Sequence, residues 1–313
     1  MRQIDASCRL HLVAALVFFA LVTAPAAPAA AGELARGIRF KLAAGDLKTG
    51  EAFAEEWRAE HGEDAEYLNG LGWLARGYQM LGDEVTALRY VRELREKIPA
   101  ETEELVVPLG AAIEVEGRIL LAREGRAAAL DFWGREAERA RDPSLRSRIW
   151  KNIDLVTLEG SAAPEIDFSD SIGAAPASLA SLRGRPVLLF FWAHWCGDCR
   201  DQAPVVARLA AKYAPLGLAV VAPTRYYGRG MEGKEATREE ERRHVAEVLA
   251  TTPSYEGFGA IPVPISEAAM VRYGASATPT LALLDRQGEI ALYTPTRMTE
   301  AELSRRIEAL LAE

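Results

Sequence analysis

An apolar run followed by two closely spaced cysteines constrains the fold of this chain more than any other feature. Residues 187–193 read VLLFFWA, with no alternation of polar and apolar side chains. A strand of this kind is buried on both faces, which requires helices on both sides of its sheet. Cys196 and Cys199 come next, at the start of a helical pattern over 199–214. The chain therefore contains an α/β unit whose cysteine pair lies where a strand ends and a helix begins.

The alternation of strands and helices continues to the end of the sequence. Further strands are expected over 218–224, 262–266, 280–288 and 290–296, and further helices over 236–252, 267–274 and 299–313. A hairpin turns at Gln287 and Gly288, and the last helix begins with a capping box formed by Thr299 and Glu302. A segment rich in Gly, Ala, Ser and Pro, residues 158–186, marks the boundary of this unit.

The part of the chain before this boundary has an Ala-rich, charged helical pattern with breaks at glycines. Residues 68–99 place small and apolar side chains where a helix-turn-helix unit resembling tetratricopeptide repeats has its packing residues. Weaker echoes lie at 43–57 and 121–143, and helix pairs of this kind bury their apolar faces by stacking. We therefore expect an all-α domain of helical hairpins over 33–158, followed by the α/β domain over 159–313. Core packing, or else a partner-binding groove, accounts for its aromatic side chains, Trp57, Tyr67, Trp73, Tyr78 and Trp133.

The N-terminal segment, residues 1–31, has the pattern of a secretory signal. Arg2 and Arg9 flank its start, a short apolar centre follows, and small residues at its end offer cleavage sites. Because Asp5 is unusual in such a segment, an uncleaved N-terminal anchor is the alternative. In both cases the bulk of the protein is expected in the periplasm or another extracytoplasmic space. The formal net charge of −8 argues against a nucleic-acid partner, which clustered Lys and Arg would favour.

Cys196 and Cys199 are the cysteines that remain once Cys8 is lost with the signal. A disulfide that closes so small a loop contributes only roughly 2 kcal/mol by the loop-closure relation, so a purely structural bridge is a less favoured alternative. Zinc needs three or four protein ligands, and the histidines show no ligand spacing, at His11, His61, His194 and His244. Covalent haem attachment would need a histidine where Arg200 stands. We expect no metal and no cofactor other than a redox-active Cys196–Cys199 disulfide.

The placement of Cys196 at a helix N-terminus has a chemical consequence. Unpaired backbone N–H groups and the helix dipole stabilise a thiolate there, and the thiolate is the attacking species in thiol–disulfide exchange. Cys199 lies one helical turn further on, more deeply buried, where it can attack the mixed disulfide and release a reduced substrate. We therefore interpret Cys196 as the nucleophile and Cys199 as the resolving cysteine.

The motifs PVLLFFWAHWCGDC and YGASATPTLALLDRQGEI resemble the thioredoxin superfamily, and the signal together with residues 163–193 resembles the TlpA/ResA-type extracytoplasmic disulfide reductases. The resemblance covers about half of the chain and implies a thioredoxin-like fold, with a central mixed sheet flanked by helices. It implies a cis bond between Thr278 and Pro279 opposite the cysteines, with Thr278 in contact with an incoming peptide. The substrate-binding residues that we expect are Trp195, Gly197, Asp198, Thr278 and Pro279.

Two positions depart from the family pattern. Phe190 stands where thioredoxins commonly bury an acid, and Gln202 stands where TlpA/ResA-like proteins often carry Glu. Gln202 can orient water but cannot take a proton at neutral pH. Asp198, Asp201 or His194 can substitute in proton handling, although each is expected to be a solvated surface group. Tyr226 and Tyr227 follow a strand and form either a lip over the active site or ordinary loop packing.

These features predict an exported thiol–disulfide oxidoreductase that reduces protein disulfides. Asp198 favours this direction, because a negative charge beside Cys196 raises the pKa of its thiol. The alternatives are a disulfide oxidase or isomerase that uses the same cysteines, and a non-catalytic adaptor that binds a partner through the helical domain. A reductase outside the cytoplasm also requires a membrane electron donor. The expected partners are thus a disulfide-containing protein, that donor and a possible partner of the helical domain.

Overall fold

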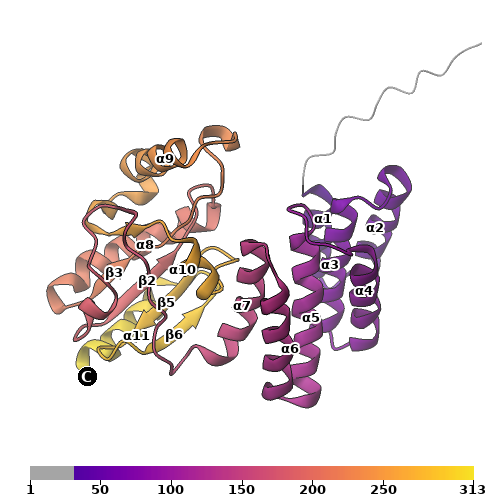
Figure 1. Cartoon of the computed structure of the whole chain (residues 1–313), viewed down its shortest axis with the longest axis horizontal. Helices are drawn as coiled ribbons and strands as arrows, with labels where there is room; N and C mark the ends of the chain where they lie inside the picture. The colour runs from indigo at the N-terminus through magenta and orange to yellow at the C-terminus, as the bar shows by residue number, and fades with distance from the viewer. Residues whose placement is uncertain (1–31) are drawn as a thin grey trace, which may run out of the picture.

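The computed structural model describes residues 32–313, so the predicted signal segment 1–31 lies outside the described residues. Figure 1 shows a helical part, coloured indigo to magenta, beside a part that contains a sheet, coloured rose to yellow. The helical part consists of α1 (Glu33–Ala43), α2 (Leu47–His61), α3 (Ala65–Met80), α4 (Glu84–Lys97), α5 (Val106–Glu124), α6 (Arg126–Arg139) and α7 (Pro143–Thr157). The sheet part consists of β1 (Ser171–Ile172), β2 (Val187–Phe191), α8 (Gly197–Tyr213), β3 (Ala219–Val221), α9 (Arg238–Thr251), β4 (Val263–Pro264), α10 (Glu267–Arg272), β5 (Thr280–Leu284), β6 (Ile290–Thr294) and α11 (Glu300–Ala312). The predicted combination of an all-α part and an α/β part is confirmed.

Short turns between well-capped helices produce the hairpins of the helical part. Aspartates cap four of the helices by accepting hydrogen bonds from backbone N–H groups, with Asp46 capping α2, Asp64 capping α3, Asp83 capping α4 and Asp142 capping α7. Between α3 and α4, Gly82 has a φ of +82°, a left-handed conformation that lets the chain reverse without side-chain strain. The helix pairs α1/α2, α3/α4 and α5/α6 fall where the sequence predicts hairpins, whereas their likeness to tetratricopeptide repeats stays a prediction.

The core of the helical part contains most of its aromatic side chains. Tyr67, Tyr78 and Trp133 are buried, which confirms core packing for these three, and Trp57 and Trp73 are half-buried against the same core. Helices α5 and α6 approach closely because α5 has a glycine at the crossing. A Cβ atom at that position, residue 117, would lie 1.9 Å from the Nε1 atom of Trp133. None of the helices between residues 32 and 313 has both the length and the apolar character that a membrane span requires.

A four-stranded sheet forms the centre of the second part, with the strand order β3-β2-β5-β6. Strand β2 is parallel to β3 and antiparallel to β5, and β5 is antiparallel to β6, so the sheet is mixed as the resemblance implied. Strands β1 and β4 form a separate antiparallel pair. The segment after α7 runs beside β6, where the Gly160 N–H donates a 2.8 Å hydrogen bond to the Ile290 carbonyl.

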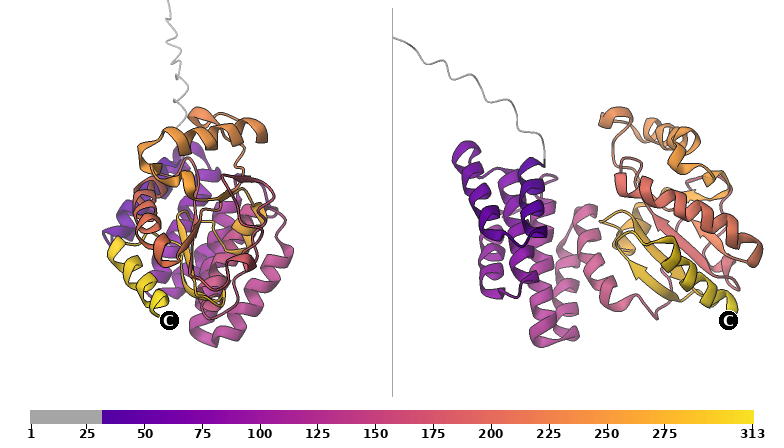
Figure 2. Two further views of the ribbon diagram at one scale, coloured as in Figure 1. Left: turned by 90° about the vertical axis from the view of Figure 1, so that its left-hand side faces the viewer. Right: turned by 180° about the vertical axis from the view of Figure 1, so that it is seen from behind.

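Alternate side chains of β2 enter two different cores, one on each face of the sheet. Leu188 and Phe190 pack with residues of α8 and α11, which lie in front of the sheet when it is seen from behind (Figure 2). Leu189 and Phe191 pack with residues of α10 and of the segment that follows α7. All five residues of β2 are buried, as the unbroken apolar run predicts.

Helix α7 of the helical part packs against α10 and the turn that follows it. The Ser147 hydroxyl donates a 3.1 Å hydrogen bond to the Met270 carbonyl, and the Arg272 guanidinium lies 4.0 Å over the Trp150 ring. Gly274 has a φ of +52°, and a Cβ atom there would lie 2.3 Å from the Lys151 Cα. This glycine therefore permits close approach of the two parts. The division into domains over 33–158 and 159–313 stays a prediction.

Candidate active site

Cys196 occupies the N-cap position of α8, after the loop that leaves β2. Its Sγ accepts a 3.1 Å hydrogen bond from the backbone N–H of Cys199. A Ser or Asp oxygen often fills this role at the start of a helix, and here a sulfur atom takes its place. The same N–H groups and the helix dipole stabilise negative charge on that sulfur in the reduced state.

The two cysteine sulfurs are joined in a disulfide and differ in their exposure. Cys196 retains 6% of its surface, whereas Cys199 is 0% exposed beneath it. A thiolate or disulfide of another molecule can thus reach the Cys196 sulfur, whereas the Cys199 sulfur is inaccessible to it. This is the arrangement that a nucleophilic and a resolving cysteine require.

The segment that leads into β5 lies opposite Cys196. The carbonyl oxygen of Thr278 is 3.3 Å from the Cys196 Sγ, and the Thr278–Pro279 peptide bond is cis, as the resemblance implied. Thr278 is half-buried and Pro279 is buried. The Thr280 hydroxyl donates a 2.7 Å hydrogen bond to the Ala277 carbonyl, which fixes the turn around them. The structure thus brings the cysteine pair and this segment together across a sequence separation of 82 residues.

Trp195 and Tyr227 form an aromatic edge beside the cysteines. Trp195 is 53% exposed, and the Tyr227 ring packs edge-on against it with 5.4 Å between the ring centroids. The guanidinium of Arg225 lies 4.8 Å over the Tyr227 ring. Tyr226 is held elsewhere, because its hydroxyl donates a 2.7 Å hydrogen bond to Asp170. The predicted lip is therefore formed by Tyr227 and does not include Tyr226.

The first turn of α8 is exposed at Gly197, Asp198 and Asp201. A Cβ atom on Gly197 would meet no other atom within 4 Å, so this side of the site is open. Both aspartates lie near Arg297, which is 3.6 Å from Asp198 and 2.6 Å from Asp201. Their prediction as surface groups is confirmed, and their ion pairs hold the segment before α11 against the active-site helix.

Gln202 is buried in α8, with 2% of its surface exposed. Its Oε1 accepts a 2.9 Å hydrogen bond from the backbone N–H of Met298. Its Nε2 is buried and has no hydrogen-bond partner among the described residues. An amide at this position can donate a hydrogen bond to water or to a substrate group, but it offers no basic site for the proton of the buried thiol.

The prediction that His194 is a solvated surface group is wrong. His194 is 2% exposed, because the loop after β2 carries its ring between Tyr227 and His244. Burial, reinforced by the nearby His244, lowers the pKa of His194 to about 4. The ring is therefore neutral at neutral pH, and neither of its nitrogen atoms has a hydrogen-bond partner within residues 32–313.

Glu241 is a site residue that the sequence analysis missed. It is 0% exposed on α9, and its carboxylate accepts hydrogen bonds of 2.7 and 2.8 Å from the backbone N–H groups of Tyr227 and Gly228. Its Oε1 also lies 3.8 Å from the His194 Nδ1. Glu241 thus fixes the loop that places Tyr227 against Trp195. The available signal was its helical spacing from the apolar Val245 and Val248, which the surrounding run of charges obscured.

Phe190 is fully buried in the core beneath the cysteines, so this position of β2 holds no acid. Within residues 32–313, no group of three or more His, Cys, Asp or Glu side chains has a geometry suited to a metal ion.

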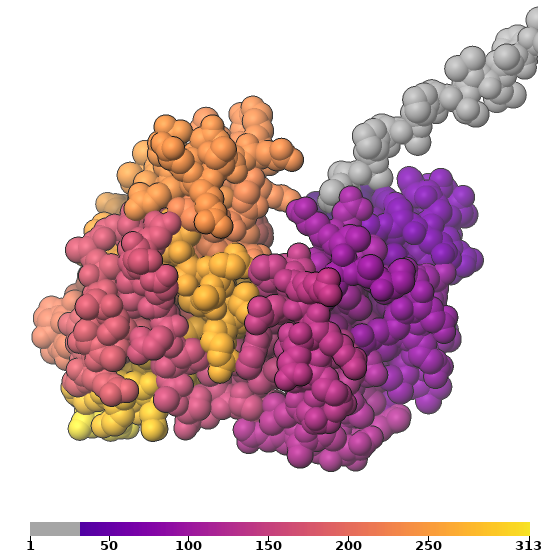
Figure 3. Space-filling model, viewed as in Figure 1, coloured from indigo at the N-terminus to yellow at the C-terminus, as the bar shows by residue number. Residues whose placement is uncertain are grey.

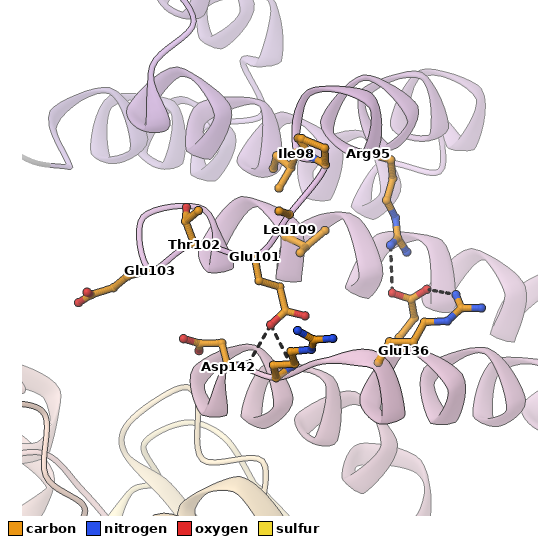
Figure 4. Close-up of a pocket in the computed structure, with 12 residues that line it drawn as sticks. Arg95, Ile98, Glu101, Thr102, Glu103, Leu109, Glu136 and Asp142 are labelled. Carbon is orange, nitrogen blue, oxygen red and sulfur yellow. Dashed lines mark hydrogen bonds and ion pairs between the residues drawn. The ribbon is translucent and has the colours of Figure 1, made fainter.

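A cavity of about 820 Å³ lies in the helical part, where charged side chains pair across it (Figure 4). Arg95 bonds Glu136 at 3.0 Å, and Glu101 accepts hydrogen bonds from two backbone N–H groups. Its lining residues belong to the helical part and not to the cysteine site.

A mixed sheet of this order, with a cysteine pair at the first turn after a central strand and a cis-proline segment opposite, defines a thioredoxin-like dithiol–disulfide site. A family model described as the AhpC/TSA family matches residues 160–224. The chain is 28% identical over 151 residues to the thioredoxin-like protein YneN of Bacillus subtilis, an alignment that covers 48% of this chain and 79% of YneN. It is 26% identical over 155 residues to ResA of Geobacillus thermodenitrificans, named a thiol-disulfide oxidoreductase, covering 48% of this chain and 77% of ResA.

Among solved structures, a putative thiol:disulfide interchange protein DsbE from Chlorobium tepidum is 26% identical, with a TM-score of 0.38, and the match covers 49% of this chain and 97% of that one. The family match and the two sequence relatives show that the chain carries an AhpC/TSA thioredoxin-like domain, homologous to the ResA and YneN proteins.

Proposed function

We propose that the protein is an exported thiol–disulfide oxidoreductase that reduces disulfides in other proteins. The observation that carries the proposal is the position of Cys196: its sulfur caps α8, accepts the Cys199 N–H at 3.1 Å and is the more exposed of the pair. This position stabilises a thiolate and leaves it accessible. The homology to ResA, which is named a thiol-disulfide oxidoreductase, supports the same reaction class.

The reaction starts from the reduced enzyme and proceeds in two exchange steps. The Cys196 thiolate attacks one sulfur of the substrate disulfide, so that a mixed disulfide forms and the other substrate sulfur leaves as a thiolate, which takes a proton from solvent. Cys199 then loses its proton to water and attacks the Cys196 sulfur as a thiolate. The mixed disulfide breaks, the second substrate sulfur leaves as a thiolate that takes a proton from solvent, and the enzyme is left with the Cys196–Cys199 disulfide. Two electrons have passed from the enzyme to the substrate.

The surroundings of the cysteines support a protein substrate. Thr278 places its backbone 3.3 Å from the reacting sulfur, where the backbone of an incoming strand can pair with it. Trp195, Gly197 and Asp198 are exposed around the same sulfur, and Pro279 fixes the direction of the Thr278 segment. We therefore propose these residues as the substrate contacts. Gln202 and the neutral His194 complete the buried side of the site and are proposed to order water near Cys199.

Reduction is the proposed direction because the negative charge of Asp198 destabilises the nearby Cys196 thiolate. Strongly oxidising enzymes instead have a stabilised thiolate in their reduced form. Arg297, 3.6 Å from Asp198, offsets part of its charge. An enzyme that is oxidised in each cycle needs a source of electrons. Residues 1–31 read as a secretory signal, which places this source at a membrane that separates the protein from the reductants of the cytoplasm. A membrane dithiol donor is thus part of the proposal.

Insulin reduction tests the activity, with wild type compared with Cys196→Ser and with the matched variant Cys199→Ala. We expect turnover only in wild type, and we expect Cys199→Ala to retain substrates as mixed disulfides that mass spectrometry identifies. Full function of Cys196→Ser in cells would instead indicate an adaptor. The reduction potential tests the direction: a value below about −200 mV supports a reductase, and a value near −120 mV would indicate an oxidase.

A further inference from the structure

A row of positive side chains runs along the helical part toward the cysteine site. It consists of Arg39 on α1, Arg76 on α3, Arg118 on α5, Arg148 and Lys151 on α7, and Arg225 after β3, and we call it the cationic row. At one end, the guanidinium groups of Arg39 and Arg76 lie 4.7 and 4.9 Å over the Trp73 ring. At the other end, Arg225 lies over Tyr227, which touches Trp195.

Glu114 is the buried carboxylate at the centre of the row. Arg76 and Lys151 each donate a hydrogen bond of 3.0 Å to its Oε2, and Arg118 lies 3.2 Å from its Oε1. These charges lower the pKa of Glu114 to about 2 despite its burial, so it is ionised at any physiological pH. One negative charge thus faces three positive ones, and the group keeps a positive excess.

Arg148 adds a further positive charge, on a side chain that is half-buried. Its Nε is buried and has no hydrogen-bond partner among the described residues, and its aliphatic stem packs over Gly110. Burial, together with the positive charges of Arg76 and Arg225, lowers the pKa of Arg148 to about 10. It remains charged at neutral pH. The carboxylates of Glu114 and Asp142 offset only part of the desolvation of the Arg148 charge. A bound anion would offset more of it.

Arg148 and Arg225 link the row to the reaction centre. Arg148 belongs to the helical part and Arg225 to the sheet part, the two bodies between which the surface is hollowed in Figure 3. Arg225 forms an ion pair at 2.6 Å with Glu267, which is itself 44% exposed. From Arg225 the contacts lead through Tyr227 to Trp195, the residue before Cys196.

We propose that the cationic row binds an acidic segment of the protein whose disulfide Cys196 reduces, with Asp or Glu carboxylates entering between the helices beside Arg148. The proposal rests on the proposed function, because it takes Cys196 as the reaction centre. Single carboxylates fit the site, since the Arg76 and Lys151 side chains are only 14% and 15% exposed and lie too deep for a flat membrane surface. The net charge of −8 disfavours polyanions at the protein as a whole, so attraction of an acidic segment needs a local positive group such as this row.

The test uses two synthetic peptides with the same internal disulfide, one followed by a run of Glu and the other by a run of Gln. For wild type we expect kcat/KM to be about tenfold higher for the Glu peptide, through KM rather than kcat, which is the size expected of a charged hydrogen bond. The ratio should fall toward one in 0.5 M salt and in Arg148→Met, which keeps the aliphatic stem and removes the charge. Arg306→Gln, an exposed site on α11 with the same change in charge, should retain the preference.

Binding of the same peptides with Ser in place of Cys separates this proposal from the proposed function. Tighter binding of the Glu peptide to oxidised wild type supports the cationic row. If neither peptide is reduced, that failure refutes only the proposed function and leaves the binding result to decide on the row. Equal kcat/KM and equal binding of the two peptides would overturn the row. So would preferential binding to vesicles that contain phosphatidylglycerol. Should Arg148→Met fail to fold, the salt dependence and the peptide binding of wild type still decide the question.

Discussion

Replacement of Asp154 by Asn is expected to remove a large pH dependence from the stability of the protein. Asp154 lies on α7, is 2% exposed and has two carboxylate oxygens without hydrogen-bond partners among the described residues. Arg272 is its nearest cation, at 3.9 Å, and is itself 46% exposed. Burial raises the pKa of Asp154 from 3.8 to about 8, and Arg272 opposes this shift only in part.

The sign of the effect follows from which state binds the proton. Below pH 3.8 the carboxyl is protonated in both states and has no effect on the free energy of unfolding. Between that pH and about 8 only the folded protein keeps the proton, so stability falls as the pH rises. At about 1.36 kcal/mol for each pH unit, the loss is about 1.5 kcal/mol at pH 5 and about 5.5 kcal/mol at pH 8.5.

The assay is urea unfolding of oxidised wild type and Asp154→Asn at pH 5 and pH 8.5, followed by tryptophan fluorescence. Groups that titrate equally in both proteins cancel in the difference. We expect the advantage of the Asn variant to grow by about 4 kcal/mol between the two pH values. Asp131→Asn, at a side chain that is 67% exposed, serves as the control and should show no such growth. A difference between Asp154→Asn and wild type that does not change with pH would refute the reasoning.

Four other substitutions test the packing and the loop beside the active site. Gly274→Ala places a Cβ atom 2.3 Å from the Lys151 backbone, so we expect the free energy of unfolding in urea to fall by at least about 3 kcal/mol. The segment after α7 should also be cleaved faster by proteases, and wild-type protease resistance would contradict this. Glu241→Ala leaves two loop amides without an acceptor and should raise KM for protein disulfides several-fold while the alkylation rate of the nucleophilic thiol is retained. Gly117→Ala should destabilise by about 3 kcal/mol or more, whereas Gly134→Ala, where a Cβ meets nothing within 4 Å, should stabilise by about 0.5–1 kcal/mol in thermal unfolding.

The parts of the structure that depend on local sequence were predictable. The unbroken apolar run gives β2 its burial on both faces, and the cysteine that follows it caps α8 because its sulfur meets the N–H groups of the first turn. The capping box at Thr299 and Glu302 starts α11 as expected. These features follow from interactions within one or two turns of chain, which a sequence displays directly.

The parts that depend on packing between distant segments were not predictable in this way. His194 precedes an exposed tryptophan and reads as a loop residue, yet α9 covers it. Glu241 lies in a run of charges, and only the fold shows that its carboxylate binds the amides of another loop. The cationic row collects residues from Arg39 to Arg225 across four helices and a loop, so no local pattern reveals it.

The pKa of the Cys196 thiol tests the central claim most directly, since the proposed reaction requires a thiolate at the start of α8. We would measure it in reduced Cys199→Ala from the pH dependence of alkylation by iodoacetamide, with absorbance at 240 nm as a second signal. We predict a pKa clearly below the ordinary value of about 8.5, as the helix N-terminus stabilises the anion. A pKa at or above that value would contradict the account.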